Sequence, residues 1–265
     1  MTMAPSGERP LEKGHWYGRD GSPVYDVPNK SKPGELRPAT ITDARKLQLV
    51  PGVTSILNVL SKPQLVRWKL EQAVLAALTY PRPGNITDIQ FVEAILDDSN
   101  RQSLDAMDKG TKIHAAIQGA YEGILWTPEY EPYVMATMEA IRKEFGSMKW
   151  IAEKPFAHNL GYGGKVDLHS ENGFFLGDFK TTSANGDKLK KAGYNDHCMQ
   201  LAAYKDGLVL TNAICFNVYI STTIPGEVFI KSWKEEDVQI SFDKFKLLLQ
   251  YWQIDKKYNS AWESL

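Results

Sequence analysis

Two aspartates and a lysine lie close together on neighbouring predicted strands of this chain. Asn172-Gly173 stands between two runs of alternating apolar residues, and this pattern favours a β-hairpin with a two-residue type I′ turn. Counting back along both strands from that turn places Asp167 directly opposite Asp178. Lys180 shares a face with Asp178, because side chains on a strand alternate with a period of two. The segment therefore predicts a compact group of two carboxylates and an ammonium.

Opposed carboxylates in a strand pair need a neutralising partner. Their Cβ atoms lie about 4.5–5.5 Å apart and like charges there are destabilising, so the site requires a cation or a shared proton. Mg²⁺ takes oxygen ligands and suits a carboxylate pair, and Lys180 beside it can orient a water and offset charge on a phosphate. The alternative is a solvated face on which Lys165 and Lys180 pair with the aspartates. Gly163 and Gly164 favour the metal site, because they leave room beside the carboxylates for a large ligand.

A helical first half followed by a sheet must position these residues. Apolar periodicity predicts an α+β fold with a mixed central sheet that is flanked by helices. The expected helices cover 54–60, 65–78, 88–97, 103–121, 129–145, 196–210 and 243–257. The expected strands cover 150–158, 162–169, 174–181, 214–221 and 227–233.

The chain divides into an arm and one domain. Recurrent Pro and Gly predict an irregular N-terminal arm over residues 1–50. A single domain is expected over 51–265, with a helical part at 51–148, a sheet core at 149–235 and a C-terminal helix at 241–258.

Composition excludes several classes of protein. The 265 residues are 43% hydrophobic, with 31 Lys+Arg against 32 Asp+Glu, which excludes wholesale disorder and a generally basic nucleic-acid coat. Two cysteines (Cys198 and Cys215) are too few for a disulfide framework or a four-cysteine metal site. No apolar run is long enough to span a membrane, and Met1–Lys13 resembles neither a secretory nor a transit peptide. We expect a reducing, cytoplasm-like compartment.

The spacing of the charged residues resembles the core of the PD-(D/E)XK nucleases. These enzymes have an acidic residue on one strand and a (D/E)-x-K motif on the next, here Gly164–Asp167 and Asp178-Phe179-Lys180. The proline that gives the family its name is absent, since Lys165-Val166 precede Asp167, as in divergent members.

Two further motifs resemble the RecB-like branch of that superfamily. Gln200 and Tyr204 match its Gln-x-x-x-Tyr motif, and a spacing of four places both side chains on one helix face. Gly110 and His114 match its Gly-x-x-x-His motif. Val53–Leu57, followed by Leu65–Lys69, also looks like the start of phage exonucleases and of the mitochondrial genome-maintenance exonuclease. The resemblance covers about residues 50–220.

The resemblance implies a restriction-endonuclease-like core and a deoxyribonuclease that depends on Mg²⁺ or Mn²⁺. Lys180 would act on the attacking water, while Gln200 and Tyr204 would orient Lys180 and the phosphate. The implied catalytic residues are Asp167, Asp178, Lys180, Gln200 and Tyr204. The implied metal ligands are His114, Asp167, Asp178 and the carbonyl of Phe179.

The expected activity is exonucleolytic digestion from linear duplex or single-stranded DNA ends in phage-type replication, recombination or repair. The alternatives are a structure- or strand-specific endonuclease and a DNA-binding module that does not cleave. No phosphate-binding loop is present, so ATP is not expected. Two cysteines exclude the iron–sulfur cluster of CRISPR-associated relatives. By resemblance, a single-strand annealing protein is a possible partner, and a bacterial or phage-infected cytoplasm is the expected location.

Other residues have weaker claims to a role. Glu153 begins the strand before the hairpin, where relatives often have an acidic residue, but a solvent-exposed position is the simpler interpretation. Lys188, Lys190 and Lys191 could hold backbone phosphates. Aromatic residues of the arm could stack on unpaired bases, with core packing or an oligomer contact as the alternatives: Trp16, Tyr17 and Tyr25.

Overall fold

The computed structural model describes residues 15–263, apart from the side chains of Gln64 and Leu65. The first 14 residues of the expected arm lie outside this part. The strands are β1 (Trp16–Tyr17), β2 (Asp26–Pro28), β3 (Leu36–Pro38), β4 (Val50–Pro51), β5 (Trp150–His158), β6 (Tyr162–Ser170), β7 (Phe175–Thr182), β8 (Ile214–Ser221) and β9 (Val228–Ser232). The helices are α1 (Ile41–Leu47), α2 (Val53–Leu57), α3 (Pro63–Thr79), α4 (Asp88–Tyr121), η1 (Pro128–Tyr130), α5 (Glu131–Phe145), α6 (Gly186–Lys190), α7 (Asn195–Gly207) and α8 (Glu235–Asp255).

The central sheet is mixed, and the predicted fold class is confirmed. Its strand order is β5-β6-β7-β8-β9. Neighbouring strands are antiparallel except β7 and β8, which are parallel and are joined through α6 and α7. A parallel pair requires such a crossover, because its two strands start at the same edge of the sheet.

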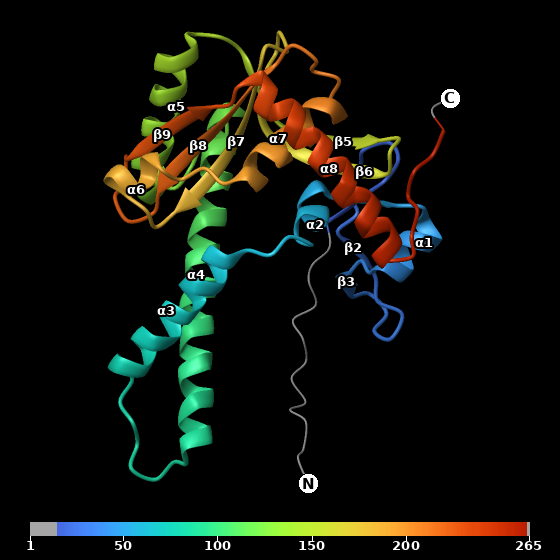
Figure 1. The fold of residues 1–265 in the computed structure, drawn as a ribbon. Coiled ribbons are helices and arrows are strands. Elements are labelled where there is room, and N and C mark those ends of the chain that lie inside the picture. Colours follow the sequence, from blue (N-terminus) through green and yellow to red (C-terminus); the bar gives the residue numbers. More distant parts are fainter. Residues whose placement is uncertain (1–14, 264–265) are drawn as a thin grey trace.

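Helices cover both faces of this sheet (Figure 1). Side chains of α4 and α5 form one buried cluster with a face that includes Leu168, Phe179 and Phe216. The other face contributes Leu176 to a second cluster, with α2, α7, α8 and the N-terminal segment. Alternation along β7 therefore turns Phe179 toward α4, while Asp178 and Lys180 face the α7 layer.

Helix α4 runs without a break from Asp88 to Tyr121, so the prediction of two helices (88–97 and 103–121) is wrong. No Gly or Pro interrupts residues 98–102, and Thr87 caps the N-terminus by accepting from the backbone N–H of Gln90 at 3.3 Å. Helix α3 packs along α4, and Figure 1 shows both extending away from the sheet. Among the described residues, no helix is both long and apolar enough to cross a membrane.

The C-terminal helix α8 begins at Glu235, well before the predicted start at residue 243. Three acidic residues occupy its first turn, where negative charge stabilises the positive end of the helix dipole. Sequence periodicity alone missed these two turns, because Val238 is their only deeply buried apolar side chain.

The N-terminal segment contributes to the core instead of forming an irregular arm throughout. Trp16 and Tyr17 are 5% and 3% exposed, and the indole N–H of Trp16 donates to the Ala39 carbonyl at 3.2 Å. Trp16 also packs at the edge of Trp252 from α8, with ring centroids 6.1 Å apart. Base stacking by Trp16 or Tyr17 is therefore ruled out in this conformation, and core packing is the observed role. Tyr25 is half-buried against Tyr17.

Candidate active site

The hairpin between β6 and β7 has the predicted register but a different turn. Leu168 pairs with Gly177, as a turn centred between Asn172 and Gly173 requires. Gly173 has a φ of 74°, but Asn172 does not have a positive φ, so the type I′ prediction is wrong. Instead, the Gly173 N–H donates to the Ser170 carbonyl at 2.9 Å and a four-residue loop separates the strands. Two- and four-residue loops with the same centre give the same register.

Beyond Leu168 and Gly177 the ladder between β6 and β7 ends, and the aspartates flank this point. Asp167 and Asp178 are therefore not a ladder pair as predicted. Instead, Oδ2 of Asp167 accepts from the Phe179 N–H at 2.8 Å. The N–H and C=O of one strand residue point to the same neighbour, so the Phe179 carbonyl faces the same side as Asp167.

Asp178 is clamped by three donors. Its Oδ1 accepts from Gln200 Nε2 at 3.0 Å, and its Oδ2 accepts from Asn217 Nδ2 at 2.9 Å. Lys180 Nζ lies 2.7 Å from the same Oδ2. The carboxylate is 1% exposed, and this burial raises its pKa, although Lys180 acts in the opposite direction. Ionised Asp178 thus depends on its donors, because burial alone favours the neutral acid.

Helix α7 brings the predicted Gln-x-x-x-Tyr pair to this carboxylate. Gln200 Oε1 accepts from Lys180 Nζ at 2.9 Å, and its Nε2 donates to the Tyr204 hydroxyl at 2.8 Å. Burial raises the pKa of Tyr204 well above its usual value, so the phenol stays neutral and can fix the amide of Gln200. The pair therefore holds Lys180 and Asp178 in one network.

Helix α4 places His114 at the same point from the opposite layer. A Cβ on Gly110 would lie 2.6 Å from Thr181 Oγ1, so a glycine lets α4 approach β7 this closely. One turn later, His114 Nδ1 lies 3.8 Å from Asp167 Oδ2. Burial lowers the pKa of His114 to about 4. The imidazole is therefore neutral near pH 7, which is the form that binds metals.

The chemistry of this donor set fits a divalent cation, but the side chains do not form a closed cage. A neutral imidazole, two carboxylates and a main-chain carbonyl suit Mg²⁺ or Mn²⁺. Within residues 15–263, however, no three His, Cys, Asp or Glu side chains converge closely enough to hold an ion. Joint binding by His114, Asp167 and Asp178 would therefore require these side chains to close on it.

The two glycines beside Asp167 make room for aromatic rings, which corrects their interpretation as space for a ligand. A Cβ on Gly163 would lie 3.1 Å from Tyr17 Cδ2, and one on Gly164 would lie 2.7 Å from Tyr204 Cε1. Both glycines thus let the N-terminal segment and α7 pack against β6. The space that they create is filled by protein.

The weaker candidates lie around this group. Glu153 is half-buried and forms an ion pair with Lys165, so neither the solvent-exposed interpretation of Glu153 nor the alternative in which Lys165 pairs with the aspartates holds. Glu153 also has a φ of 55° within β5, an uncommon conformation for a residue with a side chain. The three candidate phosphate-binding lysines lie on or next to α6 and are exposed: Lys188, Lys190 and Lys191.

Two residues near the site were missed from the sequence. Asn217 is fully buried in β8, and a polar residue between the apolar runs Ile214–Phe216 and Val218–Ile220 is the signal that could have revealed it. His197 lies one turn before Gln200 on α7 and is within hydrogen-bond distance of the Tyr219 hydroxyl, at 3.0 Å. Burial lowers the pKa of His197 to about 4.

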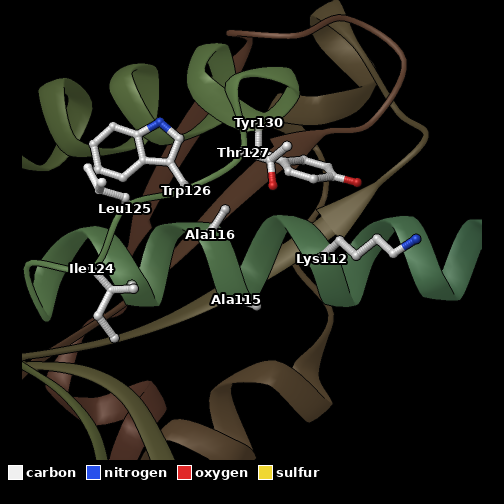
Figure 2. A pocket seen from close by; sticks show the side chains of 9 residues that line it. Lys112, Ala115, Ala116, Ile124, Leu125, Trp126, Thr127 and Tyr130 are labelled. Carbon is white, nitrogen blue, oxygen red and sulfur yellow. The ribbon is translucent and has the colours of Figure 1, made fainter.

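A separate cavity of about 260 Å³ lies beside α4 (Figure 2). None of the predicted site residues lines it. Its walls are Lys112, Ala115, Ala116, Gly119, Ile124, Leu125, Trp126, Thr127 and Tyr130.

Comparison with known proteins identifies no family. No family model matches the sequence, and no curated protein matches it. Among solved structures, the crystal structure of SSO0001 is 13% identical over 69% of this chain and 86% of its own, with a TM-score of 0.30. LHK-Exo in complex with dAMP is 15% identical over 70% of this chain and 91% of its own, also at 0.30. Structural similarities with a TM-score of 0.30 assign neither a family nor an activity to this chain.

Proposed function

We propose that this chain is a Mg²⁺- or Mn²⁺-dependent deoxyribonuclease that digests DNA from its ends. One observation carries the proposal: Lys180, Gln200 and Asp178 form a single hydrogen-bonded network where β6 and β7 separate. Asp167 and His114 reach the same point from β6 and α4. A half-buried lysine beside two carboxylates and a neutral imidazole suits phosphodiester hydrolysis better than a purely structural ion pair.

Each residue then has a defined role. His114, Asp167, Asp178 and the Phe179 carbonyl would hold the cation, which supplies positive charge to the phosphate when bound. Lys180, as an ammonium, orients the attacking water and donates to the phosphate as negative charge develops. Gln200 holds the Lys180 ammonium in place, and Tyr204 fixes the Gln200 amide.

Other functions explain these contacts less well. Glycoside hydrolysis needs two carboxylates but leaves Lys180 and Gln200 without a role. A DNA-binding module that does not cleave has no need for a lysine that a glutamine holds against a buried carboxylate. Endonucleolytic cleavage would use the same chemistry. It is distinguished from digestion of DNA ends by which DNA substrate, linear or circular, is cleaved. We also propose that the enzyme needs no ATP and that a single-strand annealing protein is its partner.

The proposal is tested with linear duplex DNA labelled at the 5′ or the 3′ end and with covalently closed circular DNA of the same sequence. We expect progressive shortening of the linear DNA with Mg²⁺ or Mn²⁺, an intact circle, and no product with EDTA. The label that is released first gives the polarity. Equal rates on circle and linear DNA would establish an endonuclease instead, and binding without product at any Mn²⁺ concentration would establish a non-cleaving module.

A further inference from the structure

We infer that Asn217 is a positioning residue for the Asp178 carboxylate and that Trp233 sets the orientation of Asn217. The inference rests on the proposed function, because its consequence is that Asp178 presents a fixed oxygen to a cation. Neither residue belongs to the motifs that identified the site.

The contacts form a chain from the end of β9 to the site. The Trp233 indole N–H donates to Asn217 Oδ1 at 2.8 Å, and Asn217 Nδ2 donates to Asp178 Oδ2 at 2.9 Å. Asn217 Nδ2 also lies 3.3 Å from the Asp178 carbonyl, so one amide contacts both the side chain and the main chain of Asp178. Asn217 is 0% exposed, and no water can replace a lost partner without entering the core.

The indole holds the Asn217 amide in the orientation that its contacts with Asp178 require. An indole N–H can only donate, so it selects the amide oxygen and leaves the NH₂ group for Asp178. Without it, the buried amide oxygen would lose its partner, and the amide could shift away from Asp178. Trp233 is itself fixed, because its backbone N–H donates to the Cys215 carbonyl at 2.9 Å and Lys231 Nζ lies 3.9 Å from its ring centroid.

Two amides therefore hold Asp178 from opposite elements. Gln200 on α7 donates to Oδ1 and is fixed by Tyr204, whereas Asn217 on β8 donates to Oδ2 and is fixed by Trp233. Since Lys180 and Asn217 both contact Oδ2, the remaining lone pair of Oδ1 is the position left for a cation. Partners of this kind change metal affinity by about 10–100-fold in proteins.

The test measures Mn²⁺ affinity of the whole protein by electron paramagnetic resonance, together with DNA cleavage at increasing Mn²⁺. The variants are Asn217→Ala and Trp233→Phe, with Trp262→Phe as the matched control. Trp262 is half-buried near the C-terminus, where its ring lies under Arg19. Trp233→Phe keeps an aromatic ring and removes the N–H, so it remains informative if Asn217→Ala does not fold.

We expect Mn²⁺ affinity to fall about 10–100-fold in Asn217→Ala and about 10-fold in Trp233→Phe, with Trp262→Phe unchanged. Cleavage by Trp233→Phe should recover at high Mn²⁺, because a misoriented carboxylate weakens binding more than the later chemistry. Wild-type affinity in folded Trp233→Phe would overturn the inference even if DNA is cleaved. A wild-type protein that binds Mn²⁺ but leaves DNA intact would overturn the proposed nuclease alone, and one that binds no Mn²⁺ would overturn both.

Discussion

At the scale of single residues, the site is defined by charges buried together. Burial raises the pKa of Asp167, which is half-buried, and of Asp178, which is fully buried, and Lys180 opposes the shift for each. His114 has a pKa lowered to about 4 by the same burial. The folded protein thus holds two carboxylates at a cost in stability, which is the usual signature of residues kept for chemistry and not for folding.

Replacing Asp167 by Asn should stabilise the protein at pH 7 in metal-free buffer while abolishing cleavage. The oxygen of the introduced amide can still accept the Phe179 N–H, and no charge is then buried. A raised folded pKa gives stability below the unfolded value of about 3.8 that is lost as the pH rises. The melting temperature of Asp167→Asn should therefore exceed that of wild type at pH 7, and the difference should shrink toward pH 4. A difference that grows on acidification would contradict the buried carboxylate.

At the scale of elements, the site depends on how closely α4 approaches β7. The contact between Gly110 and Thr181 sets this approach, and it places His114 beside Asp167. Helix α7 packs against the other face of β7. A small displacement of α4 would move the imidazole and leave the carboxylates in place.

Gly110→Ala should reduce both stability and cleavage. The new methyl would lie 2.6 Å from Thr181 Oγ1 but 3.6 Å from Thr181 Cβ, so overpacking by about 1–3 kcal/mol should exceed the gain in helix propensity of about 1 kcal/mol. Adding Thr181→Ala removes the close oxygen and should restore the free energy of unfolding in urea, with Thr181→Ala alone as the control. If Gly110→Ala is as destabilising in the Thr181→Ala background, the contact does not limit the approach of α4.

At the scale of the whole molecule, the N-terminal segment and the sheet share one core. Trp16 joins a cluster that also contains Val166 of β6 and Trp252 of α8. The Tyr258 hydroxyl donates to the Leu49 carbonyl at 2.6 Å, which links the C-terminal segment to the same region. Residues near both ends of the described chain thus stabilise the packing of Tyr17 against Gly163.

Trp16→Ala should destabilise the entire protein by about 3–5 kcal/mol, as for other large core truncations. Because the segment belongs to the common core, unfolding in denaturant should remain a single transition at lower denaturant concentration. Leu36→Ala in the same segment is the control: its side chain is 69% exposed, and a surface change alters stability by less than about 0.5 kcal/mol. A separate early transition in Trp16→Ala would show that the segment unfolds on its own.

Local patterns predicted the sheet and the residues Asp178, Lys180, Gln200 and Tyr204 that the structure brings together. Alternation predicted β5 at residues 150–158, where it lies, and a turn centred between Asn172 and Gly173 gave the right register. The packing of distant segments has no such pattern. The burial of Trp16 depends on α8, which lies more than about 200 residues later in the chain, as the contact with Trp252 shows.

The same limit explains the errors within the site. Gly163 and Gly164 predicted empty space, but which ring fills that space depends on where Tyr17 and Tyr204 fold back. Asn217 could have been noticed as a polar residue inside an apolar strand. Its pairing with Asp178 on β7 could not have been predicted, because the register between β7 and β8 is set by a long crossover and not by a hairpin turn.

The most direct test of the account is the single-turnover rate of DNA cleavage by Lys180→Ala and Asp178→Asn beside the wild-type protein. The assay uses end-labelled linear duplex DNA with saturating Mg²⁺ or Mn²⁺, and a circular dichroism spectrum confirms that each variant is folded. We predict metal-dependent cleavage by the wild type and a loss of at least about 10²–10³-fold in each variant, since each removes a charge that acts on the reacting phosphate or its cation. Wild-type rates in either folded variant would contradict the assignment of this network as the site of hydrolysis.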